Sequence, residues 1–244
     1  MRKITLIMAY YDNPEMLKIQ LSNIFEYNTE VKENLEVIIV DDCSPTHPIA
    51  EVLDNRLGTL SSVIVGVKIS IYRTLIDIPW NQDFCRNLAV SKAANEWVFL
   101  TDIDHLIPCE TLQKVMQAPD IYESMAYRFA RITAPEMTAY KHHPNTWLMT
   151  KIMYKLSGGY DEALAGYYGT DGDFTKRLGG YAGLLMREEV IIRVPREYIA
   201  DASTTRYERK NPADSERKSR IAKERNIFDG WRPLNLSFPW ERLC

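Results

Sequence analysis

Two carboxylates directly follow a short apolar run in the sequence Trp97-Val-Phe-Leu-Thr-Asp-Ile-Asp-His105. The run is typical of a buried strand, and unpaired charge is costly to bury, so Asp102 and Asp104 make poor core residues. Carboxylates one residue apart can share a hard divalent cation, Mg²⁺ or Mn²⁺, which prefers oxygen ligands and also takes substrate phosphates. The pattern favours a metal site at a strand end, and the competing interpretation is a capping Asp at a turn. His105 is either a further ligand or, as we favour, a histidine that packs against its neighbours.

Two other apolar runs also end in polar or acidic residues. The run Ile4 to Ala9 leads into Tyr11-Asp12, and the run Leu35 to Val40 leads into Asp41-Asp42. The carboxyl ends of parallel strands share one edge of a sheet, and ligands of open α/β sheets bind there. Because carboxylates repel one another, a cluster at this edge is more readily explained by a bound cation than by stability.

Helical patterns separate these strands. Pro14 suits the first helical position after a capping Asn13, and apolar residues then recur at helical spacing as far as Phe25. A second helix is predicted over Phe84 to Asn95. Strand-helix alternation of this kind predicts an α/β domain with a mainly parallel sheet. Further strands are expected over 62–72 (one or two), 127–133, 146–149 and 190–194, with helices after Pro108 and before Leu178.

The chain has 244 residues, of which 45% are hydrophobic and 26% are charged. This composition fits one globular domain with a sizeable core, or one domain with a small appendage. The formal net charge of -3 gives no overall signature of a polyanion-binding protein. No apolar run approaches the roughly 18 residues of a membrane span, and no signal-peptide cleavage site follows the first strand.

The cysteines show neither zinc-like nor Cys-x-x-Cys spacing; they are Cys43, Cys85, Cys109 and Cys244. Free thiols in a reducing compartment are expected, which predicts a cytoplasmic protein. Two other classes of α/β protein are not favoured. A nucleotidyltransferase or a dinucleotide-dependent oxidoreductase would carry a Gly-rich loop after the first strand, where this chain has Ala9-Tyr-Tyr-Asp-Asn-Pro14.

Six segments, taken in order over residues 3 to 180, resemble the motifs of the inverting, nucleotide-sugar-dependent glycosyltransferases of family 2, which have the GT-A fold. They are Ile4-Thr-Leu-Ile-Met-Ala-Tyr-Tyr-Asp-Asn13, Glu36-Val-Ile-Ile-Val-Asp-Asp-Cys-Ser44, Cys85-Arg-Asn-Leu-Ala89, Thr101-Asp-Ile-Asp-His105, Ser157-Gly-Gly-Tyr-Asp-Glu162 and Gly169-Thr-Asp-Gly-Asp-Phe174. Each segment alone is weak, but their order and spacing together are specific.

The resemblance implies a Rossmann-like, mainly parallel mixed sheet flanked by helices. It places a glycosyltransferase domain at 1–200, with a nucleotide-binding part at about 1–107 and an acceptor-binding part at about 108–200. A helical or irregular C-terminal extension, 201–244, would pack on the same domain. The implied activity is metal-dependent, inverting transfer of a sugar from a nucleoside-diphosphate sugar, with a UDP-sugar favoured, to an acceptor hydroxyl.

The resemblance also implies roles for single residues. Asp104 would be the main ligand of Mn²⁺ or Mg²⁺, with Asp102 touching the ion or the ribose. Asp171 would be the base that takes the acceptor proton, and Asp173 is the alternative. Thr170 departs from the family pattern, which has Glu there. The residues implied for nucleotide-sugar binding are Tyr11, Asp12, Asp41, Asp42, Arg86, Asn87 and Asp102.

In the nucleotide site, Tyr11 would stack on the base, while Asp41 or Asp42 would accept a hydrogen bond from a pyrimidine N–H. Arg86 and Asn87 would reach the base or the phosphates, unless Arg86 merely pairs with a strand-end carboxylate. Trp80 either lines the pocket or belongs to the core. A further metal ligand is missing from the pattern, and Asp201 or water would take its place.

The acceptor stays open between a glycan, a glycolipid and, less favoured, a hydroxylated DNA base. The basic stretch 206–225 would suit a phosphate-rich acceptor, or its residues Arg206, Arg209 and Lys210 would close over the diphosphate; a solvated helix face explains it equally well. The rival from another class is a non-catalytic relative that binds a nucleotide sugar or carbohydrate, which Thr170 leaves possible.

Overall fold

The computed structural model describes residues 1–53, 66–203, 216–217, 219–221, 223–224, 234 and 236–244. In this part the strands are β1 Ile4–Tyr10, β2 Leu35–Asp41, β3 Lys68–Thr74, β4 Trp97–Asp102, β5 His105–Leu106, β6 Met125–Thr133, β7 Thr138–Tyr140, β8 Trp147–Thr150, β9 Gly183–Arg193 and β10 Trp240–Arg242. The helices are α1 Pro14–Phe25, α2 Thr29–Glu33, α3 Ile49–Val52, α5 Gln82–Lys92, α6 Cys109–Gln117, α7 Lys151–Leu156, α8 Asp171–Leu178 and the short 3₁₀ helix η2 Glu162–Leu164.

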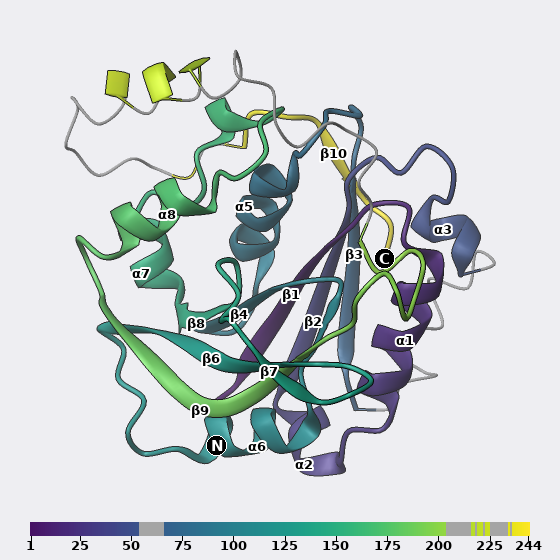
Figure 1. Cartoon of the computed structure of the whole chain (residues 1–244), viewed down its shortest axis with the longest axis vertical. Coiled ribbons are helices and arrows are strands. Elements are labelled where there is room, and N and C mark those ends of the chain that lie inside the picture. Colours follow the sequence, from purple (N-terminus) through teal and green to yellow (C-terminus); the bar gives the residue numbers. More distant parts are fainter. Residues whose placement is uncertain (54–65, 204–215, 218, 222, 225–233, 235) are drawn as a thin grey trace.

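The strands of the described part join one mixed sheet in the order β10-β3-β2-β1-β4-β8-β6-β9-β5, with β7 paired to β6 (Figure 1). The four strands β3, β2, β1 and β4 are parallel, whereas β10 and β8 flank them in the antiparallel sense. Beyond β8 most pairs are antiparallel, and β6 with β9 is the parallel exception. The predicted α/β class is therefore confirmed, with the parallel strands gathered in the first half of the chain.

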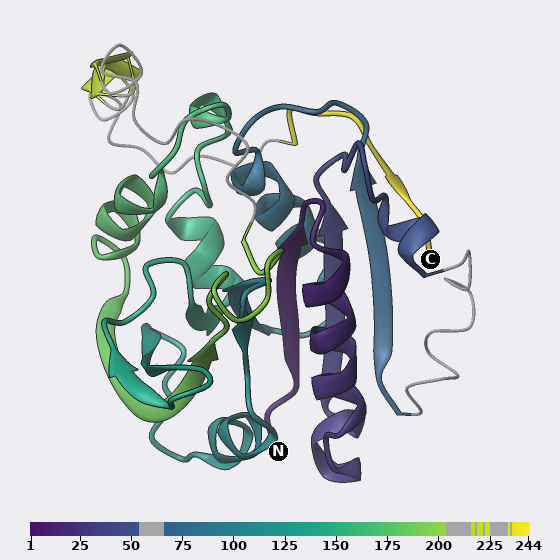
Figure 2. The same cartoon turned by 45° about the vertical axis from the view of Figure 1, so that its right-hand side comes forward.

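Helices cover both faces of the parallel strands, and each face has its own core. Leu6 and Met8 of β1 pack in a core with α1 and α6, whereas Ile7 packs in a core with α5, α7 and α8. Figure 2 shows α1 lying along the central strands. Because successive side chains of a strand point to opposite faces, a strand buried on both sides must be apolar throughout. This requirement explains the continuous apolar runs of β1 and β2.

The start of α1 confirms one prediction and corrects another. The helix begins at Pro14 as expected, but the side chain of Asn13 makes no capping hydrogen bond. The carboxylate of Asp201 accepts instead from the backbone N–H groups of Glu15, at 2.7 Å, and Met16, at 3.1 Å. Asp201, which is remote in sequence, thus accepts from backbone N–H groups of the first turn that have no partner within the helix.

Several elements of the second half differ from the sequence prediction. β9 starts at Gly183, well before the predicted Val190, and its residues Leu184 and Met186 are exposed. Their segment has no apolar alternation, so only its backbone pairing with β6 makes it a strand. Helix α7 and the short strands β5, β7 and β10 were not predicted. Residues 62–65 of the strand predicted before β3 lie outside the described residues.

The last residues pack on the body, as predicted for the apolar C-terminal stretch. Strand β10 pairs with β3, and Trp240 lies edge-on to Tyr72 with 5.8 Å between ring centroids. Phe238 meets Phe84 of α5 edge-on at 5.3 Å. The basic stretch 206–225 lies mostly outside the described residues, and the domain boundary at 200 stays a prediction. Among the described helices, none is long and apolar enough to cross a membrane.

Candidate active site

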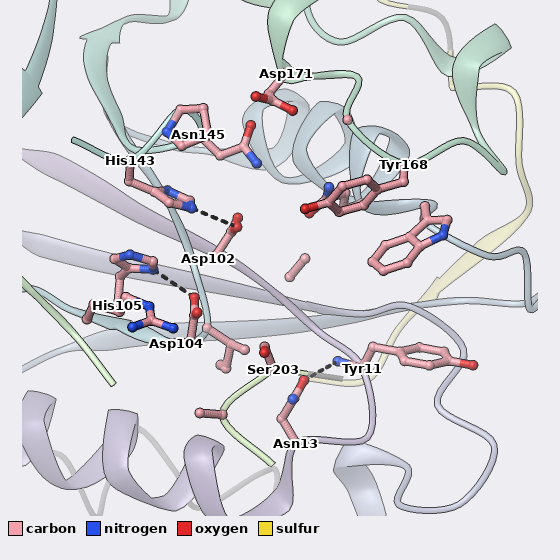
Figure 3. A pocket seen from close by; sticks show the side chains of 18 of the residues that line it. Tyr11, Asn13, Asp102, Asp104, His105, His143, Asn145, Tyr168, Asp171 and Ser203 are labelled. Carbon is pink, nitrogen blue, oxygen red and sulfur yellow. Dashed lines mark hydrogen bonds and ion pairs between the residues drawn. The ribbon is translucent and has the colours of Figure 1, made fainter. Parts of the chain in front are cut away.

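The sheet brings the predicted strand ends together at one edge. β1 lies between β2 and β4, so that Tyr10 is opposite Asp41 and Ala9 is opposite Asp102. A cavity of about 670 Å³ opens above this edge (Figure 3). The predicted site residues that line it are Tyr11, Asp42, Asp102, Asp104 and Asp171. Residues predicted for the site that do not line it are Asp12, Asp41, Arg86, Asn87 and Asp173.

Asp102 is held by two basic side chains, one on each carboxylate oxygen. Arg86 of α5, itself fully buried, forms a very short ion pair with Oδ1, and His143 Nε2 lies 3.3 Å from Oδ2. Burial alone would raise the pKa of Asp102, but Arg86 and then His143 outweigh it, and the pKa lies well below its ordinary value. Asp102 is therefore an oriented, permanently charged carboxylate, and Arg86 pairs with it rather than facing the cavity.

Asp104 heads a second chain of contacts. Its Oδ1 lies 2.7 Å from His105 Nδ1, and His105 Nε2 lies 2.8 Å from a guanidinium nitrogen of Arg131. Since Arg131 can only donate, Nε2 is the acceptor, and the proton of His105 sits on Nδ1 facing Asp104. Both nitrogens of His105 are occupied, which supports the neighbour-packing interpretation over the ligand one. Asp104 Oδ2 accepts no hydrogen bond from any described residue.

The two carboxylates fit a divalent cation by the chemistry of their donors. Asp104 offers a free hard oxygen toward the cavity, and Asp102 stands beside it with both oxygens already contacted. Among the described residues, no group of three or more His, Cys, Asp or Glu is arranged to hold a metal. Asp201 caps α1 and is not a third ligand here. An ion at Asp104 would therefore take its other ligands from water and phosphate, as Mg²⁺ commonly does.

Asp171 and Asp173 have separate surroundings. Asp171 is the first residue of α8, and Figure 3 shows its carboxylate directed into the cavity from the side facing Asp102. Asp173 forms an ion pair with Arg177 at 2.8 Å and is absent from the cavity lining. Thr170, which stands where the family has Glu, donates to the buried Asp83 at 2.9 Å. Of the two candidate bases, only Asp171 lies where a substrate would be.

Asp12 and Asp41 bind backbone amides below the cavity. Asp12 Oδ1 accepts from the N–H groups of Thr46, at 3.1 Å, and His47, at 2.7 Å. Asp41 accepts from Ser44 N at 2.8 Å and Ile49 N at 2.9 Å. These bonds shape the loop between β2 and α3. A direct contact of Asp12 or Asp41 with the donor stays a prediction that the cavity lining does not support.

Asp42, in contrast, lines the cavity while its side chain is buried. Its nearest hydroxyl is that of Thr74, whose Oγ1 lies 3.4 Å from Oδ1. Burial raises the pKa of Asp42 to about 8, and Asp41 and Asp77 add to the rise. Of the two acidic residues after β2, Asp42 is the one placed to meet a ligand.

Asn87 holds a turn rather than a ligand. Its amide nitrogen donates to Tyr160 O and Glu162 Oε1, both at 2.8 Å, and its oxygen accepts from Tyr154 Oη and Tyr160 N. The Gly-Gly turn before Tyr160 is needed for this packing. A Cβ on Gly159, which has φ +63°, would stand 2.6 Å from the Asn87 oxygen.

Aromatic side chains form one end of the cavity. Trp80 and Tyr168 meet at 4.9 Å between ring centroids, and both line it. Tyr11 lies at the same end (Figure 3), and its hydroxyl donates to Asp77 at 3.1 Å. Trp80 therefore belongs to the pocket, one of the two positions that the sequence left open.

Sequence reasoning missed several residues that line the cavity, among them His143, Arg131 and Tyr168. The ring of His143 lies tilted against that of His105, with 4.0 Å between ring centroids, and touches Asp102, which lies 41 positions away, so no local spacing connected them. The only signal was compositional, since two of the four histidines stand in the loop Lys141-His-His-Pro-Asn145. Burial is the main cause that lowers the pKa of His143, which favours its neutral form at pH 7.

Comparison with known proteins agrees with this geometry. The model of the family "Glycosyl transferase family 2" matches residues 5–170. Among solved structures, the mannosyltransferase PcManGT from Pyrobaculum calidifontis with GDP-Man and Mn²⁺ has a TM-score of 0.64 at 16% identity, covering 96% of this chain and 66% of its own. TarS 1–349 of S. aureus with UDP-GlcNAc gives 0.66 at 16% identity, covering 93% and 67%. GalNAc-T7 with UDP, GalNAc and Mn²⁺ gives 0.61 at 11% identity, covering 80% and 44%.

These structures are similar in fold, and this chain spans about two thirds of the first two. No curated protein sequence matches the chain. The family model covers well over half of the chain and contains every cavity carboxylate named above except Asp171, which directly follows the matched region. The chain belongs to glycosyl transferase family 2 and has the GT-A fold.

Proposed function

We propose that this protein moves a sugar from a UDP-sugar to an acceptor hydroxyl with inversion at the anomeric carbon, assisted by Mn²⁺ or Mg²⁺. The observation that carries the proposal is the arrangement of Asp171 across one cavity from Asp102 and Asp104 (Figure 3). Inversion by direct displacement needs the base and the leaving diphosphate on opposite sides of the sugar. A cavity with carboxylates on facing walls provides both positions.

The nucleoside would lie at the aromatic end of the cavity. Tyr11, Trp80 and Tyr168 offer rings for stacking on the base, and Asp42 offers a carboxylate oxygen to a pyrimidine N–H. Uracil has such an N–H and cytosine lacks it, so we favour UDP over a cytidine nucleotide. Solved relatives with UDP-GlcNAc and UDP support this choice, while the relative with GDP-Man keeps a guanine nucleotide as the competing donor.

The diphosphate would lie near Asp102 and Asp104. We assign Asp104 as the main ligand of a divalent cation, because, unlike Asp102, it keeps one carboxylate oxygen, Oδ2, without a described partner. Such an ion supplies the counter-charge for the departing diphosphate. Two solved relatives were obtained with Mn²⁺, which supports the assignment. Arg86 and His143 act on Asp102, whose orientation they fix.

The proton of the acceptor would pass to Asp171. This side chain is partly exposed to the cavity and stands at the N-terminus of α8, where the helix dipole favours a negative charge. Thr170 and Asp83 hold the start of α8 through their hydrogen bond. A charged, positioned carboxylate beside the reacting hydroxyl is what general-base catalysis requires.

The test needs no knowledge of the acceptor. Purified protein is incubated with a panel of nucleotide sugars and Mn²⁺ or Mg²⁺, and release of the nucleoside diphosphate by slow donor hydrolysis is followed. We expect one UDP-sugar to turn over, with loss of activity on chelation and in Asp104→Asn. The exposed Asp120→Asn serves as a matched control and should keep full activity.

Asp171→Asn should still bind the nucleotide but lose transfer once an acceptor is known, since it removes the base and not the donor site. Nucleotide binding without turnover by any donor would leave the base and metal roles unsupported. No binding of any nucleotide and no turnover would refute the proposal in favour of a non-catalytic carbohydrate-binding protein.

A further inference from the structure

Three basic side chains line the second end of the cavity: Arg131 of β6, Lys141 after β7 and Arg193 at the end of β9. None of the three forms an ion pair with a carboxylate of the described chain. Basic residues elsewhere in the same structure do find such partners; Arg86, Arg177 and Arg187 each contact an Asp within 4 Å. Three cations without a carboxylate partner in the described chain therefore stand on the lining of one cavity.

Arg131 is the most informative of the three, because only 5% of it is exposed. Its Nε donates to Lys141 O at 2.6 Å, and Nη1 donates to His105 at 2.8 Å. Nη2 donates to no described residue. Burial is the main influence on the pKa of Arg131, which it lowers. A desolvated guanidinium facing a cavity is costly unless an anion completes its hydrogen bonds.

An aromatic ring stands between the guanidinium groups. Tyr140, with 46% of its surface exposed, lies 4.7 Å from Arg131 and 5.2 Å from Arg193, measured from ring centroid to guanidinium carbon. Tyr140 also lines the cavity. Exposed rings of this kind provide a flat apolar surface on which a ligand can stack, while the flanking cations fix charged groups beside it.

The three cations lie away from the nucleoside end. Arg131 contacts His105, and Figure 3 places His105 and His143 at the end opposite Tyr11 and Tyr168, with Asp102 between. The strands that carry the cations also differ, since β6, β7 and β9 follow β8 in the sheet while the nucleotide edge belongs to β1, β2 and β4. The free side of the sugar, rather than the nucleoside, would face this wall.

We propose that Arg131, Lys141, Arg193 and Tyr140 form the acceptor subsite and select an acceptor that carries an anionic group, a phosphoryl or a carboxylate, near its reacting hydroxyl. The inference rests on the proposed function and narrows its acceptor. Arginine pairs bidentately with both anions, and lysine adds a flexible point charge. A neutral glycan would leave the buried charge of Arg131 without a counter-ion.

The experiment uses the protein saturated with UDP and Mg²⁺, so that the donor phosphates already hold their places. Glycerol 3-phosphate, glucuronate and uncharged glycerol are titrated in by calorimetry. We expect one anion to bind per chain and glycerol not to bind. Lys141→Gln/Arg193→Gln should weaken anion binding by about tenfold or more, as expected for loss of charged hydrogen bonds.

A matched control removes two positive charges at positions outside the cavity. Lys155→Gln/Lys176→Gln alters exposed lysines outside the cavity and should change anion affinity by less than about twofold, as for screened surface charges. UDP affinity should be the same in all variants. The phosphate and glucuronate arms identify which anion is preferred. Sedimentation with phosphatidylglycerol vesicles, against phosphatidylcholine ones, separates a lipid phosphate from a soluble one.

Two outcomes would overturn the subsite. Absence of anion binding to the UDP-loaded protein is one. The other is a loss of UDP affinity in Lys141→Gln/Arg193→Gln, or displacement of UDP by glycerol 3-phosphate, because the cations would then belong to the donor diphosphate. Failure of every nucleoside diphosphate to bind is a different result, since it refutes the proposed function before any acceptor is considered.

Discussion

Asp42 gives a prediction that joins nucleotide recognition to pH. Burial raises the pKa of this carboxyl to about 8, so at pH 7 only about one molecule in ten carries the charged form. An ionised Asp42 is the better acceptor for a pyrimidine N–H, because charge-assisted hydrogen bonds are the stronger ones. Binding of UDP at pH 7 would therefore have to remove a proton, at a cost of about 1.4 kcal/mol for one pH unit.

The affinity for UDP should accordingly rise with pH. Below its pKa the ionised fraction grows about tenfold per pH unit, so we expect about a tenfold gain from pH 6 to 7 and about fivefold from 7 to 8. Calorimetry in two buffers of different ionisation enthalpy should detect release of about one proton per UDP bound at pH 7. UDP itself titrates in this range, so the wild type is compared with a variant.

Asp42→Asn is that variant, because an amide oxygen still accepts the N–H but cannot ionise. It should bind UDP with the pH dependence of the ligand alone. Equal pH profiles for wild type and Asp42→Asn would refute the reasoning, as would a wild type that releases no proton. Stability gives a second readout. The folded pKa lies above the ordinary value of 3.8, so the folded state holds the proton more tightly, and stability should fall as pH rises from about 4 to 8; Asp42→Asn should remove that part of the slope.

Three further predictions concern the supports of the site. Arg86 pairs with Asp102 and also lies 3.8 Å from the buried Asp83. Arg86→Met leaves both carboxylates without this cation, and urea unfolding should show a loss of about 3–5 kcal/mol, which Asp83→Asn should partly restore. An unchanged midpoint would contradict the pairing. Gly159→Ala should cost about 1–3 kcal/mol because its Cβ meets packed atoms at positive φ, whereas Gly166→Ala, with φ +92° and nothing within 4 Å, measures the backbone strain alone and should cost less. Mn²⁺ should bind weakly to the free protein and at least about tenfold more tightly with UDP, with the same factor in the reverse order of addition; tight binding without nucleotide, seen by electron paramagnetic resonance, would refute a site completed by phosphate.

The sequence was sufficient to place the strand-end residues at one edge of the sheet. This inference needed only the apolar runs and the rule that parallel strands end together, and the register of Ala9 with Asp102 bears it out. The order of motifs was enough for the family. The apolar runs and the motif order are both patterns of nearby or regularly spaced residues, so a single sequence is enough to recognise them.

The contacts that the strand-end residues make could not be predicted from the sequence in the same way. Asp41 and Asp42 are adjacent and identical, yet one binds backbone amides and the other faces the cavity. Whether Asp102 faces Arg86 or a ligand depends on how α5 packs on the sheet. The sequence also did not predict the proposed acceptor subsite, because Arg131, Lys141 and Arg193 come together only through the pairing of β6 with β7 and β9.

The charges at the strand ends show why the metal should depend on the nucleotide. A cluster of carboxylates suggested a cation, yet most of them are balanced without one. Backbone amides bind Asp12 and Asp41, Arg86 and His143 hold Asp102, and burial keeps Asp42 protonated at neutral pH. Of the two carboxylates that follow Thr101, only Asp104 keeps an oxygen without a described partner, and one carboxylate is a weak site for Mg²⁺ or Mn²⁺ in water. A nucleoside diphosphate brings the remaining oxygen ligands, so donor and metal should bind together and leave together.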